Sequence, residues 1–263
     1  MIFTYSSQFK DGLLSYKKAM VFLSKNNLTY FFVFPLIFNL FIFISGFYYL
    51  DQFLEFLNSE LVSYIELQTS NNSYLRSDYI FKFMYVLTWM ISKIIFVFIF
   101  SLFGGYLTII LLSPVYTILS EKTATILNGT KMNFDAVQFI SDILRAILIA
   151  FRNILLQLVL HIILLCFSIV PVLGWAVAFI GNLAFASYFY GFSFMDYTME
   201  RHQLSIKDSV LFVRKNKGLA VGLGVVFQVC MLVPFIGSFT ASFLSIISVV
   251  SATITLEENK LLE

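Results

Sequence analysis

The sequence predicts an all-α integral membrane protein with a single membrane domain over residues 1–263. Hydrophobic residues make up 59% of the chain and charged residues only 12%, whereas soluble domains are about half apolar and about a quarter charged. Residues 26–50, 94–120, 153–195 and 218–256 contain no Asp, Glu, Lys or Arg. A helix needs roughly 20 apolar residues to cross a bilayer, so each run is long enough. The apolar residues do not alternate strictly, which favours helices over a membrane barrel.

Residues 1–25 are predicted to form an amphipathic helix in the membrane interface. Apolar residues recur there at helical spacing, and three lysines lie off this stripe. The stripe consists of Phe9, Leu13, Tyr16, Met20 and Leu23. Such a helix lies flat on the bilayer with its lysines toward anionic headgroups. The alternative is a solvent-facing helix that packs on the rest of the protein.

Residues 26–120 are predicted to form two spanning helices, with residues 51–79 outside. Four lysines and one aspartate precede the first span, whereas residues 51–79 contain five acidic residues and one arginine. Basic flanks stay in the cytoplasm, so we expect the N-terminus inside. Segments 121–152 and 196–217 contain nine Lys or Arg residues and are also expected inside. The C-terminus is inside as well if each remaining apolar run forms a hairpin.

The second half of the chain contains a weak internal repeat. Three pairs recur with an offset of 63 positions: Arg152-Asn153 with Lys215-Asn216, Val170-Pro171 with Val233-Pro234, and Leu173-Gly174 with Ile236-Gly237. Repeats of this kind are common in transporter folds. Proline and glycine break a helix, so the repeat predicts two helical hairpins, at residues 146–198 and 218–256.

Both predicted turns are unusually apolar, although a turn in water normally carries polar residues. Each first arm has about 17 residues, or roughly 25 Å of helix, which is short of a full crossing. We therefore predict half-penetrating hairpins that enter from the cytoplasm and turn within the apolar layer. Irregular backbone at that depth must be covered by protein or face a water-filled cavity, which predicts a pore or an oligomer. Ordinary spanning hairpins are the alternative.

Several short motifs follow one another in a fixed order along the chain. They are Phe34-Pro35-Leu36-Ile37-Phe38-Asn39, Leu112-Ser113-Pro114 with Glu121, Asp142 with Arg145, the Val-Pro-x-Leu-Gly turn, and Met195-Asp196-Tyr197 through His202. From about Ser6 to Thr255 the chain resembles the CysZ sulfate permeases and their relatives in the etoposide-induced membrane-protein superfamily. The resemblance implies two transmembrane helices, two half-penetrating hairpins and cytoplasmic termini. It also implies a homodimer or larger homo-oligomer in a bacterial inner membrane, and passive, proton-sensitive sulfate uptake.

One segment departs from the pattern of that family. Where the family carries a Gly-Leu-Arg-Arg segment as its anion site, this chain reads Asn27-Leu28-Thr29-Tyr30. Arginine suits a tetrahedral oxyanion because its planar fork makes paired charge-assisted hydrogen bonds. Asn27 and Thr29 donate hydrogen bonds without charge, and Lys25 is the nearby cation. The candidate substrate-binding residues here are Lys25, Asn27 and Thr29.

The two turns provide the other candidate donors. A new helix starts after Pro171 and Pro234, and a helix N-terminus presents unpaired N–H groups with a partial positive charge. Gly174 and Gly237 lack side chains, so an anion could approach the backbone there. We expect an anion to pass near Gly174, Gly237 and Ser238. The competing interpretation is that both glycines only permit a tight turn.

Two further polar features have a structural and a functional interpretation. Hydroxyls recur along the last arm at Ser238, Ser242, Ser245, Ser248, Ser251 and Thr255. They could line a conduction path, but small residues also let helices approach closely, and we favour the second interpretation. His161 lies one turn after Gln157 within an apolar arm. A polar residue there is a functional candidate, but we favour a hydrogen bond between packed helices.

The remaining sequence features exclude several functions. Cys166 and Cys230 are not part of a CxxC motif or a His/Cys cluster, so neither a metal site nor a cofactor is predicted. The chain has no nucleophile elbow, phosphate loop or HExxH motif, so we do not expect an enzyme. A net charge of +2 gives no indication of nucleic-acid binding. Three functions remain: a permease or channel for a small anion such as sulfate, a transporter of another small solute, and a non-transporting membrane scaffold or stress protein.

Overall fold

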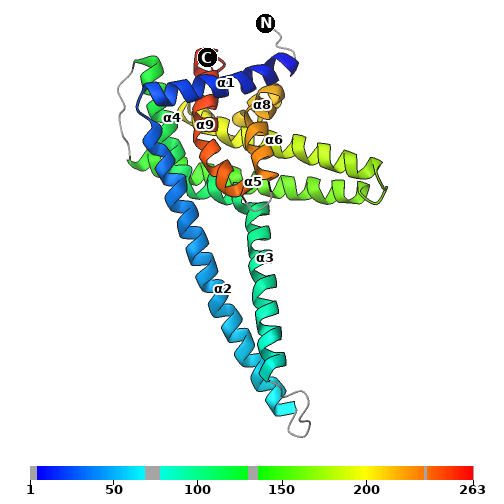
Figure 1. Cartoon of the computed structure of the whole chain (residues 1–263). Coiled ribbons are helices and arrows are strands. Elements are labelled where there is room, and N and C mark those ends of the chain that lie inside the picture. The colour runs from blue at the N-terminus through cyan, green and yellow to red at the C-terminus, as the bar shows by residue number, and fades with distance from the viewer. Residues whose placement is uncertain (1–4, 69–77, 130–135, 234–235, 263) are drawn as a thin grey trace.

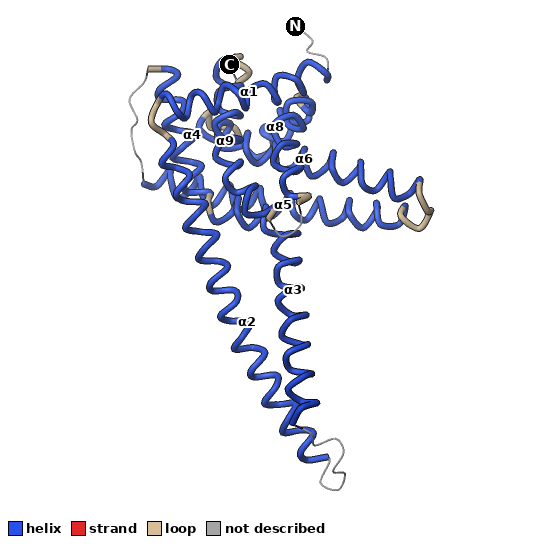
Figure 2. Tube along the Cα trace, viewed as in Figure 1, coloured by secondary structure: helices blue, strands red, loops and turns tan. Residues whose placement is uncertain are grey.

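The computed structural model describes residues 5–68, 78–129, 136–233 and 236–262, and every regular element in these ranges is helical (Figures 1 and 2). The elements are α1 (Tyr5–Lys25), the short 3₁₀ helix η1 (Thr29–Phe32), α2 (Val33–Gln68), α3 (Asp78–Leu111), α4 (Ser113–Asn128), α5 (Ala136–Phe167), α6 (Leu173–Arg201), α7 (Ile206–Lys215), α8 (Lys217–Met231) and α9 (Gly237–Glu258). The predicted all-α class is confirmed. Four of the described helical segments are long and apolar enough to cross a membrane: Thr29–Phe56, Ala136–Phe167, Leu173–Arg201 and Phe239–Glu258.

Local sequence explains where several helices begin and end. Pro114 lies in the first turn of α4, where its missing N–H costs no hydrogen bond, and it separates α4 from α3. Gly129 ends α4 in the left-handed conformation, with φ of 64°, as glycine allows. Ser205 caps α7 by accepting a hydrogen bond from the N–H of Asp208, which satisfies an otherwise unpaired donor.

The helices form a packed body from which two arms extend. In the body α9 is the central helix and contacts α1, α4, α6 and α8. In the most apolar stretch of Phe239–Glu258 78% of the residues are buried, against 17% in that of Thr29–Phe56. Helix α9 therefore forms the core, whereas α2 presents its apolar side chains to the surroundings. Helix α1 and the end of α9 lie at the same end of the molecule (Figure 1).

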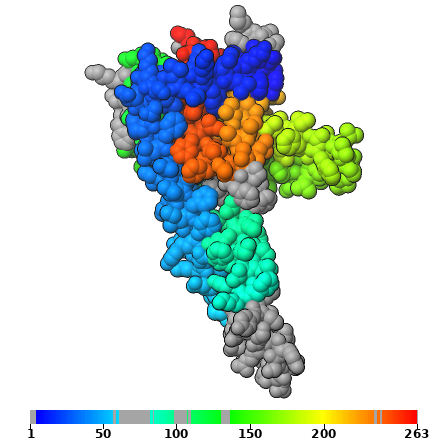
Figure 3. Space-filling model, viewed as in Figure 1, coloured from blue at the N-terminus to red at the C-terminus, as the bar shows by residue number. Residues whose placement is uncertain are grey.

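The two arms are the helix pairs α2–α3 and α5–α6, which leave the body in clearly different directions (Figures 1 and 3). The members of each pair lie side by side and contact each other. Both arms are rich in exposed apolar side chains, such as Phe41 on α2 and Ile162 on α5. Because the arms diverge, they cannot both stand along the normal of the same bilayer.

The α2–α3 arm carries a charged cluster well along its length. Asp51 accepts hydrogen bonds from Lys93 Nζ at 2.7 Å and from Trp89 Nε1 at 2.9 Å. Asp51 follows Val33 by 18 residues, about 27 Å of helix, which is close to the thickness of a bilayer core. The helix then continues to Gln68, and α3 starts at Asp78, so much of the segment 51–79 is helical. Residues 69–77 lie outside the described residues.

Helix α1 forms as predicted, but its packed face differs from the predicted apolar stripe. The buried residues of α1 are Gly12, Ser15, Tyr16, Ala19 and Leu23. Met20 is instead 57% exposed. The cause is close packing on α8, where a Cβ added to Gly12 would lie 2.9 Å from the backbone of Gly222. One face of α1 is therefore packed on protein, and an interfacial position for the exposed face stays a prediction.

The sequence repeat extends to the hydrogen bonds of the two turns. In both turns the glycine N–H donates to the carbonyl four residues earlier, at 3.0 Å from Gly174 to Val170 and at 2.8 Å from Gly237 to Val233. The equivalent valine N–H groups each donate to the carbonyl three residues earlier, both at 3.1 Å. The helix bounds differ from the predicted hairpins 146–198 and 218–256, because α5 begins at 136 and α6 ends at 201, whereas α8 and α9 cover 217–258.

Candidate functional site

A polar cavity of about 230 Å³ lies between α5, α6 and α8 and is partly open to the surface. Its polar lining residues are Gln157 and His161 of α5, Asn182 and Tyr190 of α6, and Gln228 of α8. The other lining residues are apolar, and none of the lining residues is Asp, Glu, Lys or Arg. The volume greatly exceeds the roughly 10–15 Å³ that one water molecule requires, so this cavity can hold a hydrated solute.

Helical periodicity places these side chains together. Gln157 and His161 are four residues apart, which puts them on the same face of α5. Asn182 and Tyr190 are eight residues apart, or about two turns of α6. Both helices carry these residues within segments that are apolar enough to span a membrane. Polar side chains at such depth are costly and face protein or water rather than lipid.

Glycine contacts bring α8 against α6, and so bring Gln228 to the cavity. A Cβ added to Gly224 would lie 1.8 Å from the carbonyl oxygen of Ser187, and one added to Gly191 would lie 1.8 Å from that of Ala220. No larger residue fits at either crossing without moving the backbone. Gln228 lies one turn after Gly224 on the same face of α8.

A buried ion pair joins α5 to α6 near the body. Arg145 donates to both carboxylate oxygens of Asp196, through Nε at 3.2 Å and through Nη2 at 2.9 Å. The same guanidinium donates to Ser209 Oγ at 2.7 Å and to the carbonyl of Leu204. The Asp196 side chain is 3% exposed, and its pairing compensates for the loss of solvent. The ion pair therefore links α5 to α6 and to the segment that leads into α7.

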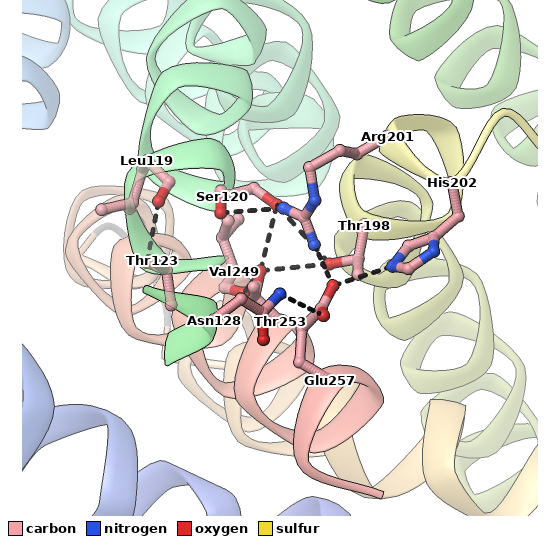
Figure 4. Close-up of polar contacts among 10 residues, drawn as sticks. All are labelled: Leu119, Ser120, Thr123, Asn128, Thr198, Arg201, His202, Val249, Thr253 and Glu257. Carbon is pink, nitrogen blue, oxygen red and sulfur yellow. Dashed lines mark hydrogen bonds and ion pairs between the residues drawn. The ribbon is translucent and has the colours of Figure 1, made fainter. Parts of the chain in front are cut away.

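A second charged network connects α4, α6 and α9 (Figure 4). Arg201 forms an ion pair with Glu257 and donates to the carbonyl of Ser120 at 2.9 Å. His202 Nε2 lies 2.9 Å from the same carboxylate, and Asn128 donates to its other oxygen at 2.9 Å. Glu257 of α9 thus has a partner at each carboxylate oxygen, and these partners come from α4 and from the end of α6. The network therefore holds the three helices together. 

One acidic residue beside these networks has a perturbed ionisation. Burial raises the pKa of the partly buried Glu121 on α4, Arg201 opposes this rise and Asp142 reinforces it. The carboxyl is therefore easier to protonate than an ordinary glutamate.

Among the described residues, no group of three or more His, Cys, Asp or Glu side chains could hold a metal ion.

The predicted row of hydroxyls on α9 is packed into the core. Ser242, Ser245, Ser248, Ser251 and Thr255 are buried. Tyr116 OH bonds to Ser245 Oγ, Tyr16 OH lies 2.7 Å from Ser248 Oγ, and Asn39 Nδ2 donates to Ser242 Oγ at 2.5 Å. These partners come from α4, α1 and α2. The interpretation as close helix packing is confirmed for these residues.

The segment before the first span is held in a specific backbone geometry. Asn27 has φ of 55°, a left-handed conformation that glycine and asparagine adopt most readily. Asparagine thus keeps the backbone that a glycine would allow. Lys25 and Thr29 are exposed. Lys122 of α4 donates to Tyr30 OH at 2.7 Å, and so brings a cation to this segment that sequence spacing did not indicate.

The two turn glycines have close backbone neighbours. A Cβ added to Gly174 would lie 1.9 Å from the carbonyl oxygen of Phe167, and one added to Gly237 would lie 2.6 Å from that of Cys230. Their N–H groups already donate to carbonyls within the turns. The structure thus supplies a tight-turn role for both glycines. The side chain of Ser238 and residues 234–235 lie outside the described residues.

The structure does not bring all the predicted site residues together. The junction of α1 and α2, with Lys25, Asn27 and Thr29, lies on the opposite side of the body from the α5–α6 turn (Figure 1). From the sequence, Gln157 and His161 were functional candidates, but a hydrogen bond between packed helices was the favoured interpretation. Sequence reasoning missed Asn182 and Gln228, because only the tertiary fold brings α6 and α8 to α5. A polar residue within an uncharged apolar run was the available signal.

Two comparisons with known proteins agree with each other. The family model described as "Sulfate transporter CysZ/Etoposide-induced protein 2.4" matches residues 15–241. The "Sulfate transporter CysZ" of Vibrio parahaemolyticus serotype O3:K6 (strain RIMD 2210633) is 26% identical over 138 residues. That alignment covers 52% of this chain and 56% of the relative, so the chain spans about half the length of this relative.

Proposed function

The chain belongs to the sulfate transporter CysZ/etoposide-induced protein 2.4 family, and from this premise we propose that it is a passive membrane permease for a small inorganic anion such as sulfate. In this proposal the protein catalyses no chemical reaction and binds no cofactor. Its partners are the anion and the lipid bilayer. Sulfate is the favoured anion because the family description and the Vibrio relative both name it.

The polar cavity between α5, α6 and α8 is the observation that carries the proposal. A scaffold protein has no need for five polar side chains around an open cavity within apolar helices, because each polar group is costly in the membrane. A permease needs such a place, where polar groups replace part of the hydration shell of the solute.

The divergence of the two arms supports partial insertion of the helix pairs. If α2–α3 crosses the bilayer, α5–α6 does not cross it in the same direction, because the two pairs leave the body in clearly different directions (Figure 1). We propose that the apolar turn of α5–α6 at residues 168–172 stays within the apolar layer. Val172 and Leu173 at this turn are 71% and 73% exposed, which suits contact with lipid or with a second subunit. We therefore propose half-penetrating hairpins over the predicted segments 146–198 and 218–256, in a homodimer or larger homo-oligomer.

The orientation follows from the distribution of charge. We propose a bacterial inner membrane protein with cytoplasmic N- and C-termini, α1 at the cytoplasmic interface, and the far end of α2–α3 outside. The position of α1 and the end of α9 at one end of the molecule fits this orientation. The Asp51–Lys93 pair, about one bilayer thickness along α2, would then mark the outer interface.

Anion entry is proposed at the junction of α1 and α2. Lys25, Asn27 and Thr29 offer hydrogen bonds and one charge, and Lys122 adds a second cation beside Tyr30. We also propose that the anion passes near Gly174, Gly237 and Ser238. The N–H groups of the two glycines already donate hydrogen bonds to backbone carbonyls, so other N–H groups of the turns would have to contact the anion.

The proposal is tested by flux into liposomes that contain the purified protein. Sulfate should enter down its gradient without ATP or an added ion gradient, and should stop at equal concentrations on both sides when the membrane potential is held at zero. Protein-free liposomes and liposomes with an unrelated membrane protein are the controls.

The outcomes separate the candidate functions. Uptake of thiosulfate or chloride without sulfate would replace sulfate by another anion. Uptake of an uncharged solute alone would indicate a transporter of a different class. If no small solute crosses faster than in the controls, a non-transporting scaffold would take the place of the permease.

A further inference from the structure

The two repeat units differ at the positions that line the polar cavity. A shift by the repeat offset of 63 residues places Gln157 at Ala220 and His161 at Gly224. In α8 these small residues permit tight contact, since a Cβ on Gly224 would lie 1.8 Å from the carbonyl of Ser187. In α5 the same repeat positions carry long polar side chains that line the cavity. The second repeat unit thus uses these two positions for close helix packing, whereas the first repeat unit uses them to line the cavity.

The lining offers several neutral hydrogen-bond donors. Asn182 and Gln228 each have a carboxamide with two N–H donors, and His161 adds a ring nitrogen. Gln157 and Tyr190 line the same cavity and also interact with other groups of the protein, but the carboxamide of Gln157 has two N–H donors and can serve more than one partner. Carboxamides can also accept hydrogen bonds, so the lining alone does not select the sign of a ligand's charge. That selection must come from the charges around the cavity.

The charge nearest to the cavity along α5 is positive. Arg152 precedes Gln157 by five residues, and its guanidinium lies 5.7 Å from the ring of Phe192 on α6. Residues 153–195, which include the turn and most of α6, contain no charged residue. The charged residue that follows this stretch on α6 is Asp196, and its carboxylate is paired with Arg145. The field around the cavity therefore favours an anion, because residues 153–195 contain no carboxylate that would repel negative charge.

We propose that this cavity binds a single tetrahedral oxyanion, with sulfate as the reference ligand, through neutral side-chain donors rather than a salt bridge. The inference rests on the proposed function and specifies how the permease selects its substrate. A volume of about 230 Å³ leaves room for waters that stay bound to the anion. Neutral donors hold the anion weakly enough for it to leave, as conduction requires.

Removal of a donor is the direct test. Gln157→Met and Gln228→Met keep the length of the side chain but remove its N–H groups. Each should lower the rate of sulfate uptake about tenfold or more, as expected for the loss of a hydrogen bond to a charged group. Gln52→Met is the matched control, because Gln52 is exposed on α2 and its carboxamide donates to Tyr48 OH, away from the lining residues.

Ionic strength gives a second test of the neutral site. Binding to cations at the surface weakens as salt screens the charges. The cavity proposal instead predicts that the KM for sulfate in the wild type changes less than twofold when an impermeant salt is raised. A steep rise in this KM would place recognition at charged residues and overturn the cavity as the selective site.

The outcomes distinguish the cavity from the proposed function. If the wild type transports sulfate and both cavity variants transport it at the same rate, the cavity is not the site although the permease stands. If the wild type transports nothing, the proposed function fails, and the thermal stability of the detergent-solubilised protein then decides about the cavity. Sulfate stabilises proteins in general, so a larger stabilisation in the wild type than in Gln157→Met supports the site, whereas equal shifts overturn it.

Discussion

Replacement of Arg145 by Met should strongly destabilise the fold. Arg145 donates to both oxygens of Asp196, and the two side chains are only 14% and 3% exposed. Among the residues that the structure describes, Arg145 is the cation paired with Asp196, so the substitution leaves a buried carboxylate whose remaining hydrogen-bond partner is Ser209. Removal of one member of a buried pair typically costs about 3–5 kcal/mol. We expect a loss of this size in the free energy of unfolding.

The measurement is unfolding of the purified protein in mixed micelles, followed by helical circular dichroism as a denaturing detergent is added. Lys18→Met is the matched control, because Lys18 and Glu258 also form an ion pair, at 2.6 Å, but with side chains that are 61% and 42% exposed. Such an exposed pair contributes about 0–1 kcal/mol. A second change, Asp196→Asn in the Arg145→Met protein, should restore part of the loss because it removes the unpaired charge.

Two results would contradict this reasoning. Equal and small effects of Arg145→Met and Lys18→Met would mean that water reaches Asp196 and that the pair is not buried in the protein. A double variant as unstable as the sum of its single changes would mean that Arg145 acts through packing rather than through the charge of Asp196.

Three further predictions test the placement of the chain and its helix contacts. Both native cysteines are first replaced, and single cysteines are then introduced at Lys17 and at Glu60. The cysteine at position 17 should react with an impermeant thiol reagent only after cell lysis, whereas the one at position 60 should react in intact cells, since basic flanks stay inside. The reverse pattern would invert the topology. A cysteine at Leu173 should resist the same reagent in intact cells, and rapid labelling there would establish a spanning hairpin. Gly224→Ala should prevent normal folding, because its Cβ would lie 1.8 Å from a backbone oxygen; the measurement is loss of the monodisperse peak in gel filtration. Gly181→Ala is the control and should be tolerated, because its Cβ would meet only the Leu164 side chain, at 2.9 Å. Equal behaviour of the two variants would refute the close crossing of α6 and α8.

Sequence alone predicted the features that depend on local pattern. Uncharged apolar runs identified the long helices, because a bilayer imposes a minimum apolar length. The Val-Pro turns were predicted because proline and glycine restrict the backbone in a known way, and the offset of 63 residues linked them before their hydrogen bonds were seen. The motifs shared with the family also gain a structural explanation, since Arg145 and Asp196 belong to two separate motifs and form one ion pair.

The features that depend on which helices meet could not be predicted. The stripe on α1 was assigned from its largest apolar residues, but the packed face is set by small ones, because Gly12 and Gly222 let the two helix backbones approach. Hydrophobic periodicity ranks residues by size and polarity and gives no weight to glycine. Asn182 and Gln228 were missed for a related reason, since a single polar residue in an apolar run does not reveal its neighbours.

The junction of α1 and α2 shows how a site can keep its geometry while its charge comes from elsewhere. Asn27 adopts φ of 55°, so the backbone turn that a glycine permits survives the loss of that glycine. The positive charge absent from Tyr30 is present at Lys122, whose Nζ lies 2.7 Å from the Tyr30 hydroxyl. Because Lys122 is 92 residues away in the sequence, no motif in the segment itself could reveal it. A lysine is a point charge without the paired donors of arginine, so an anion bound here would be attracted but held less rigidly, which fits a place of entry better than a place of selection.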